Sequence, residues 1–172
     1  MAQAAGAQGT IDARDELAVK SAFVFNFAAR HVKWPEAAFK DKSAPFVIGV
    51  LGRDPIAAVL TETCKGRKSG ERPIEVRVVE PDVAGDCQLL FVPAGREAEV
   101  PALAQTLKDR PVLLVAESEA AVQRGAHLGF FLANSRVRFA AHPASAKQAG
   151  LEVSSELLKL ARVVERRAED QP

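Results

Sequence analysis

The chain has 172 residues, of which 48% are hydrophobic and 26% are charged, with 23 Lys and Arg against 22 Asp and Glu. This profile is typical of one globular domain that can bury a core without a metal or several disulfides. The formal net charge of +1 disfavours a general nucleic-acid-binding protein. The longest strongly apolar stretch, 17–29, is shorter than the roughly 20 residues needed to span a bilayer.

The first ten residues are small or polar. They contain neither the positively charged region nor the apolar region of an intact secretory signal peptide. Such residues are typical both of an ordinary tail and of an exported chain whose signal peptide has been removed. The residues by themselves leave export open.

Helix-favouring residues over 12–34 predict a first helix, which ends because Pro35 disfavours helical geometry in the residue before it. Phe23, Phe25 and Phe27 lie on opposing sides of this helix, since they are spaced by two residues. We therefore expect the helix to be largely buried, either in the core or partly against a partner.

Strands and helices alternate after this helix. The β-branched run 46–51 predicts a buried strand. Asp54 and Pro55 predict the start of a helix that ends near Gly66. Residues 74–79 alternate with period two, which is typical of a strand that has one solvated face near the edge of a sheet.

The middle of the chain repeats this pattern. Residues 88–92, which are apolar after Gln88, predict a central strand. A helix is expected over 97–107, and another buried strand over 111–116. We find neither a domain-boundary linker nor an internal repeat.

The last third begins with a predicted hairpin. Residues 127–132 and 136–140 predict two strands joined by a turn near Asn134. Arg136 and Arg138 are two residues apart on the second strand, so both guanidinium groups lie on one face. That face is either a solvated edge or a site for an anion or carboxylate, whose oxygens match arginine donors.

Two further helices complete the predicted fold. A short helix is expected over 143–149, ended by Gly150, and a last amphipathic helix is capped by Ser154 or Ser155. The apolar side of the last helix carries Leu157, Leu158, Leu160, Ala161 and Val164. The whole pattern predicts a single-domain α/β layered fold with a mixed β-sheet flanked by helices.

Recognised catalytic motifs are lacking in the sequence. The turn after the first strand lacks the glycine spacing of a dinucleotide site, and neither a nucleophile elbow nor a zinc-binding helix motif occurs. Three histidines lie on three separate predicted elements: His31, His127 and His142. We therefore predict no catalytic residue, no metal site and no cofactor.

Three other residues have two interpretations each. Trp34, the only tryptophan, either packs in the core or covers the anion site formed by Arg136 and Arg138. Cys64 and Cys87 are too few for a zinc site built from cysteines alone. They are either a disulfide or two buried thiols.

Ordered segments at both ends of the chain carry a family resemblance. The segments are 20–28, 32–35, 46–55, 87–92, 136–139, 146–150 and 154–164. Together they resemble the YfiR-like family of bacterial periplasmic proteins over about residues 18–164. The sequence departs from the family at Phe25, where a tyrosine often stands, and in lacking a second cysteine pair.

The resemblance implies one YfiR-like α/β domain over 15–165, between a flexible tail at 1–14 and a charged tail at 166–172. It implies a periplasmic location, with the signal peptide absent from this sequence. The implied function is repression, without enzyme activity, of a membrane-anchored diguanylate cyclase or other membrane sensor through contact with its periplasmic region. The resemblance also implies a homodimer, with no cofactor and no nucleic acid.

Two more expectations depend on the resemblance. Export permits oxidation and both cysteines lie at element ends, so an intrachain disulfide between Cys64 and Cys87 is expected. The alternative function is a small-molecule sensor in which Trp34, Arg136 and Arg138 bind a carboxylate or aromatic ligand.

Overall fold

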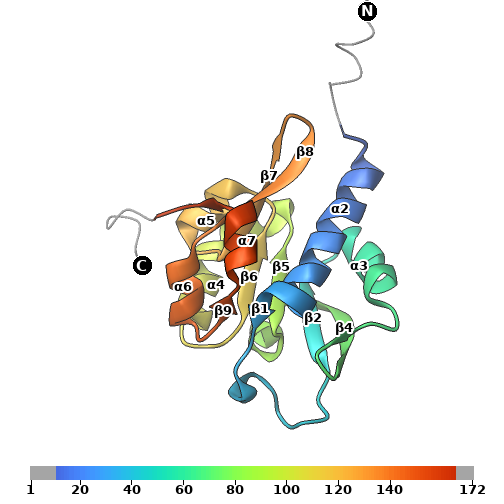
Figure 1. Cartoon of the computed structure of the whole chain (residues 1–172), viewed down its shortest axis with the longest axis vertical. Helices are drawn as coiled ribbons and strands as arrows, with labels where there is room; N and C mark the ends of the chain where they lie inside the picture. The colour runs from blue at the N-terminus through green and yellow to red at the C-terminus, as the bar shows by residue number, and fades with distance from the viewer. Residues whose placement is uncertain (1–10, 166–172) are drawn as a thin grey trace, which may run out of the picture.

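A mixed β-sheet forms the middle layer of the molecule (Figure 1). The computed structural model describes residues 11–165. The strands are β1 (Val32–Lys33), β2 (Phe46–Leu51), β3 (Lys68–Ser69), β4 (Arg72–Val79), β5 (Leu89–Val92), β6 (Leu113–Ala116), β7 (Leu128–Ala133), β8 (Arg136–Ala141), β9 (Glu152–Val153) and β10 (Arg162–Val163). Eight of them form one sheet in the order β10-β8-β7-β6-β5-β2-β4-β3, and β1 pairs with β9 separately.

The centre of the sheet is parallel and its flanks are mixed. Strands β4, β2, β5, β6 and β7 run parallel to one another, whereas β8 is antiparallel to β7 and β3 is antiparallel to β4. Helical connections between parallel strands place helices on the faces of such a sheet. The predicted fold class, a single α/β layered domain with a mixed sheet, is confirmed.

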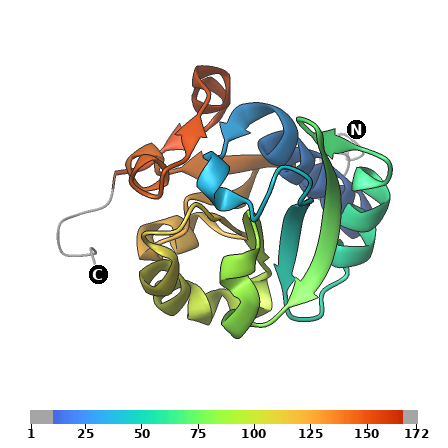
Figure 2. The same cartoon turned by 90° about the horizontal axis from the view of Figure 1, so that it is seen from below.

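Helices cover both faces. The α-helices are α2 (Ala13–Asn26), α3 (Ile56–Cys64), α4 (Val100–Leu107), α5 (Glu119–Arg124), α6 (Pro143–Gln148) and α7 (Ser155–Leu160). Shorter turns are η1 (Phe27–His31), η2 (Glu36–Ala38), η3 (Pro81–Asp86) and η4 (Ala94–Glu99). In Figure 2, α2 and α3, drawn in blue and blue-green, lie across the sheet from α4 and α5, drawn in yellow-green to tan.

Side-chain alternation along β2 divides the core into two apolar clusters. Ile48 and Val50 pack in the cluster beneath α2 and α3, which we call the first cluster. Val47 and Leu51 pack in the cluster beneath α4 and α5, the second cluster. Because successive strand residues point to opposite faces, the sheet itself separates the two clusters.

The first helix is shorter than the sequence predicts. It begins at Ala13, within the predicted tail 1–14, and Asp12 caps it by accepting a hydrogen bond from the Arg14 backbone N–H at 2.7 Å. After Asn26 the chain continues as the π-helical turn η1, and Val32 and Lys33 then form β1. The prediction of helix over 32–34 is wrong, because Val32 and Lys33 pair with β9, which is far away in the sequence, and Trp34 follows this strand.

The end of the chain departs from the prediction in two places. The six-residue helix α5, after β6, was not predicted. The last helix ends at Leu160 rather than continuing to Val164, because Arg162 and Val163 pair in parallel with β8. Ser154 is its cap, since its Oγ accepts a hydrogen bond from the Leu157 backbone N–H at 3.1 Å. Residues 1–10 and 166–172, which include most of the predicted tails, lie outside the described residues.

The predicted disulfide is wrong, because both cysteines are free. Cys64 ends α3 and packs in the first cluster. Cys87 precedes β5 and packs in the second cluster. The sheet lies between these clusters, so the two cysteines pack on opposite faces of it.

Candidate functional site

A groove runs between the β7–β8 hairpin and the end of α7. It has a volume of about 360 Å³ and is lined by Phe131, Ala133, Arg138, Phe139, Lys159, Leu160, Ala161 and Arg162. Three of these side chains are cationic and none is acidic. We call this feature the hairpin groove.

The hairpin projects beyond the parallel part of the sheet. Ala116, the last residue of β6, pairs with Gly129, so the rest of β7 extends past the carboxyl end of its neighbour. The turn residues Asn134 and Ser135 both have positive φ values, 53° and 60°, as two-residue hairpin turns require. The predicted hairpin with its turn near Asn134 is confirmed.

One face of this projection is packed and the other is polar. Phe130 and Phe139 pack against Phe23 and Phe27 of α2 and η1, at ring-centroid distances of 5.1–6.0 Å. Arg136 and Arg138 are exposed, while Val137 and Phe139 between and after them are buried. The two arginines therefore share the face that α2 does not cover.

Cationic and apolar groups alternate on the groove. The Arg162 guanidinium lies 4.2 Å from the centroid of the Phe131 ring, and its Nη1 donates a hydrogen bond to Glu119 at 2.8 Å. Leu160 is 60% exposed, and the neighbouring Val163 is 52% exposed. Apolar contact area beside the cationic Arg138 and Lys159 is the composition expected of a surface that binds an acidic protein segment.

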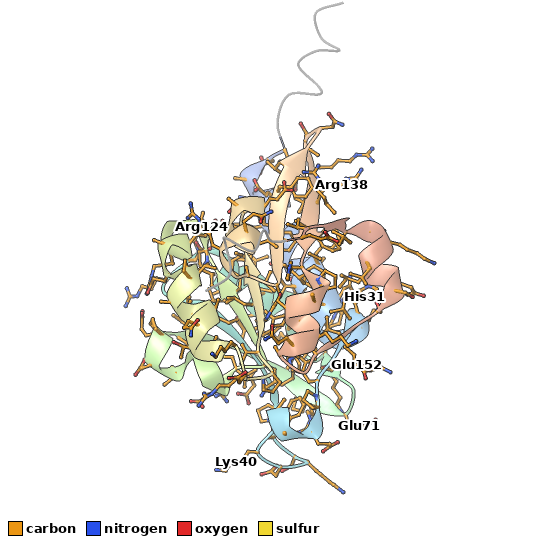
Figure 3. All side chains as sticks on the ribbon, turned by 90° about the vertical axis from the view of Figure 1, so that its left-hand side faces the viewer. His31, Lys40, Glu71, Arg124, Arg138 and Glu152 are labelled. Atoms are coloured by element: carbon orange, nitrogen blue, oxygen red, sulfur yellow. The ribbon has the colours of Figure 1, made fainter. Side chains whose placement is uncertain are left out.

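Trp34 lies at the other end of the sheet. Its Nε1–H donates a hydrogen bond to the carbonyl oxygen of Gln88 at 2.8 Å. Its ring packs edge-on against the Phe46 ring, with the two ring centroids 4.7 Å apart. Phe46 begins β2 and Gln88 precedes β5, so Trp34 packs at the amino ends of the parallel strands. The structure does not bring Trp34 to the two arginines. In Figure 3, Arg138 lies near one end of the molecule and Lys40, which is close to Trp34 in sequence, lies at the opposite end.

A buried ion cluster at the carboxyl ends of the strands was missed by the sequence reasoning. Lys20 of α2 is 7% exposed, and its Nζ lies 2.7 Å from Glu16 and 4.0 Å from Glu117. Burial raises the pKa of Glu117, and the Lys20 charge opposes that rise. The signal available in the sequence was a lysine within the apolar stretch of the first helix. The cluster ties α2 to the loop after β6, so it supports the face opposite the hairpin groove.

The three histidines have separate roles. The Nδ1 of His31 lies 3.2 Å from the Ser154 hydroxyl, at the start of α7. His127 and His142 lie next to each other, since the His142 backbone N–H donates to the His127 carbonyl at 2.9 Å. Within residues 11–165, no group of three or more His, Cys, Asp or Glu side chains is placed to hold a metal ion.

Comparison with known proteins supplies the remaining information. A family model described as YfiR/HmsC-like matches residues 17–162. No curated protein matches the chain at a significant level. None of the helices within residues 11–165 has the length and apolar character required to cross a membrane.

Proposed function

The chain belongs to the YfiR/HmsC-like family, and we propose that it represses a membrane-anchored diguanylate cyclase, or a related membrane sensor, by binding its periplasmic region. The observation that carries this proposal is the family match, which extends over nearly all of the described residues. Family membership supports a periplasmic regulator of diguanylate cyclase in general. The particular partner and the sign of the regulation belong to the proposal.

The hairpin groove is the proposed contact surface. Arg138 and Lys159 give it a positive charge, since Arg162 is paired with Glu119, and Leu160 adds exposed apolar area. We assign an acidic segment of the cyclase's periplasmic region as its occupant, because opposite charges steer association and apolar area at the centre of a contact supplies affinity. Arg136 extends the positive face toward the tip of the hairpin.

Regulation by contact requires no catalytic group. The proposal therefore includes that the purified protein turns over neither GTP nor cyclic-di-GMP. It also includes a homodimer, which the family resemblance suggests and which sedimentation of the purified protein would measure. Turnover by the purified chain would contradict the non-enzymatic part of the proposal.

Reconstitution of the cyclase tests the proposal. Diguanylate cyclases that have periplasmic regions and come from the same genome would be placed in nanodiscs, so that both faces are accessible. Cyclic-di-GMP synthesis from GTP would be measured while the purified protein is added. We expect one of these cyclases to be inhibited at saturation.

Charge-reversal variants test the contact surface. Arg138→Glu combined with Lys159→Glu should weaken inhibition by about tenfold or more, since like charges across an interface disfavour binding. Lys40→Glu is the matched control, because Lys40 is exposed at the opposite end of the molecule (Figure 3). Inhibition of no cyclase would overturn the function, whereas equal effects of the two variants would overturn only the assignment of the surface.

A further inference from the structure

The outer edge of β8 lies open beside the hairpin groove. Strand β10 pairs with β8 only at Ala140 and Ala141, near the base of the hairpin. Residues 136–139 continue toward the tip, and no strand within residues 11–165 pairs with their outer side. In Figure 1 the hairpin rises above β5 and β6, so this edge stands clear of the parallel part of the sheet. An open edge of this kind can pair with another extended segment.

Main-chain hydrogen-bonding groups point outward from this edge. The His142 backbone N–H donates to the chain just before β7, whereas the Ala141 carbonyl accepts from the Val164 N–H on the β10 side. Main-chain groups alternate between the two sides of a strand, so the odd-numbered residues of β8 face outward. Val137 therefore directs its N–H and its carbonyl away from β7, and Phe139 directs its N–H the same way. Within residues 11–165 these three groups have no hydrogen-bond partner.

The same edge borders the cations of the groove. Arg138 lines the groove together with Lys159 from the end of α7. Phe139 also lines it, although its ring is buried and packs against Phe23 and Phe27 on the other face of the hairpin. The part of Phe139 that faces the groove is therefore its main chain. Main-chain donors and positive side chains thus lie next to each other.

A strand added to this edge would have two different faces, because residues that lie beside each other on adjacent strands share a face of the sheet. Its residues beside Arg136 and Arg138 would lie on the exposed cationic face, which favours carboxylates. Its residues beside Val137 and Phe139 would lie on the α2 side, where Phe23 is half-buried, which favours apolar side chains. The complementary ligand is an extended segment in which acidic and apolar residues alternate.

We propose that the outer edge of β8 binds such a segment of the partner by strand addition. Main-chain hydrogen bonds to Val137 and Phe139 supply affinity that is independent of sequence, and the alternation of side chains supplies specificity. This inference rests on the proposed function, which assigns an acidic segment to the hairpin groove. It adds the sequence pattern of that segment and the way in which it binds.

Peptide binding to the full chain tests the proposal. The probe is a seven-residue peptide in which glutamate alternates with valine, blocked at both ends. We expect calorimetry to give a dissociation constant below about 1 mM. Two further peptides carry methyl groups on the backbone nitrogens of either the valines or the glutamates. These two have the same charge and the same side chains, so each is the control for the other.

The methylated peptides report main-chain pairing, because only one side of an added strand faces β8. In an antiparallel strand the valine nitrogens would face Val137, and in a parallel strand the glutamate nitrogens would. We expect one methylated peptide to bind about tenfold more weakly than the other, and its identity gives the direction of the strand. No binding of the probe, or equal affinities of the two methylated peptides, would overturn strand addition.

Hydrogen exchange followed by NMR locates the pairing. With the probe at saturation, the amide protons of Val137 and Phe139 should exchange about tenfold more slowly or less. Leu132 is the control, because it lies on the opposite edge of the hairpin, where β7 pairs with β6 no further than Gly129. Protection of Leu132 in place of Val137, or protection of neither, would overturn the assignment to β8.

Charge variants test the cationic face. Arg138→Gln should weaken probe binding by about threefold or more, whereas Lys40→Gln, at the opposite end of the molecule, should leave it unchanged. Equal affinities of the two variants would overturn the role of charge in this site.

These measurements involve no cyclase, so the two proposals fail separately. Cyclase inhibition together with equal binding of the methylated peptides would retain the proposed function and reject strand addition. Pairing of the probe with β8 but inhibition of no cyclase would retain the edge site and reject the function.

Discussion

In the second cluster, the backbone of Gly49 in β2 lies close to the Cys87 side chain, just before β5. A Cβ atom added to Gly49 would lie 2.5 Å from the Cys87 Sγ, 3.1 Å from the Val79 Cγ2 and 3.3 Å from the Leu90 Cδ1. All three neighbours are buried, at 8% exposure or less. A Gly49→Ala substitution therefore inserts a methyl group into occupied space.

The expected magnitude follows from two opposing effects. Overpacking a core costs about 1–3 kcal/mol, and replacing a strand glycine by alanine returns about 0.5–1 kcal/mol of backbone entropy. We expect Gly49→Ala to lower the free energy of unfolding by about 1–2 kcal/mol. Each kcal/mol lost should lower the Tm by about 2–4 °C in a domain of this size.

A second substitution should relieve the clash. Cys87→Ala by itself removes the sulfur and leaves a small cavity, which costs about 1 kcal/mol. In the double variant the new methyl group at position 49 occupies the space that the sulfur leaves. The double variant should therefore be more stable than the sum of the single effects predicts, by about 1 kcal/mol or more.

Urea denaturation followed by far-UV circular dichroism, on the native chain, both single variants and the double variant, measures this coupling. Gly95→Ala is the matched control, because nothing lies within 4 Å of a Cβ added there. We expect this control to be at least as stable as the native protein, since it gains the backbone entropy without a clash. Strict additivity of the two single effects, or native stability of Gly49→Ala, would refute the packing that we describe.

Three more predictions concern buried ionisable groups. Unreduced protein should contain two free thiols that react with a thiol reagent only after unfolding, because both are buried and burial raises the pKa of each to about 11; a bridged species in mass spectrometry would contradict this. The pKa of each thiol is lower in the unfolded chain than in the folded one, so between about pH 9 and about pH 11 the folded state binds more protons. The free energy of unfolding should therefore fall as the pH rises from about 9 toward about 11. Urea titrations across that range measure the fall, which should be smaller in the Cys64→Ala, Cys87→Ala variant, and an identical slope in both proteins would contradict the assignment. Lys20→Met should destabilise the fold by about 2–3 kcal/mol, because it leaves the partly buried Glu117 without its cation, and adding Glu117→Gln should restore part of the loss. Native stability of Lys20→Met in urea would show that the cluster contributes nothing.

Local sequence patterns were sufficient to predict most strands. The β-branched run 46–51 forms β2 with the predicted bounds. The turn of the hairpin lies at Asn134 and Ser135, as expected. The capping role predicted for Ser154 or Ser155 falls to Ser154. These features depend on the residues within one element, so propensity, periodicity and turn chemistry determine them.

Elements that depend on distant partners were predicted less well. Val32 and Lys33 look helical in sequence, yet they form β1 because β9 lies beside them. The last helix stops early because Arg162 and Val163 pair with β8. Here hydrogen bonds to a distant strand override local helix propensity, and no short window of sequence contains that information.

The sequence by itself determined which residues alternate on each strand, and so placed Arg136 and Arg138 on one exposed face. Only the tertiary structure decided which faces and ends come together. It separates Cys64 from Cys87 by the thickness of a sheet and Trp34 from Arg138 by the length of the strands. It also brings the end of α7 beside β8, where Lys159 and Arg138 line one groove. The physical reason is that side-chain direction follows from local backbone geometry, whereas proximity follows from the order in which strands pair across the whole sheet.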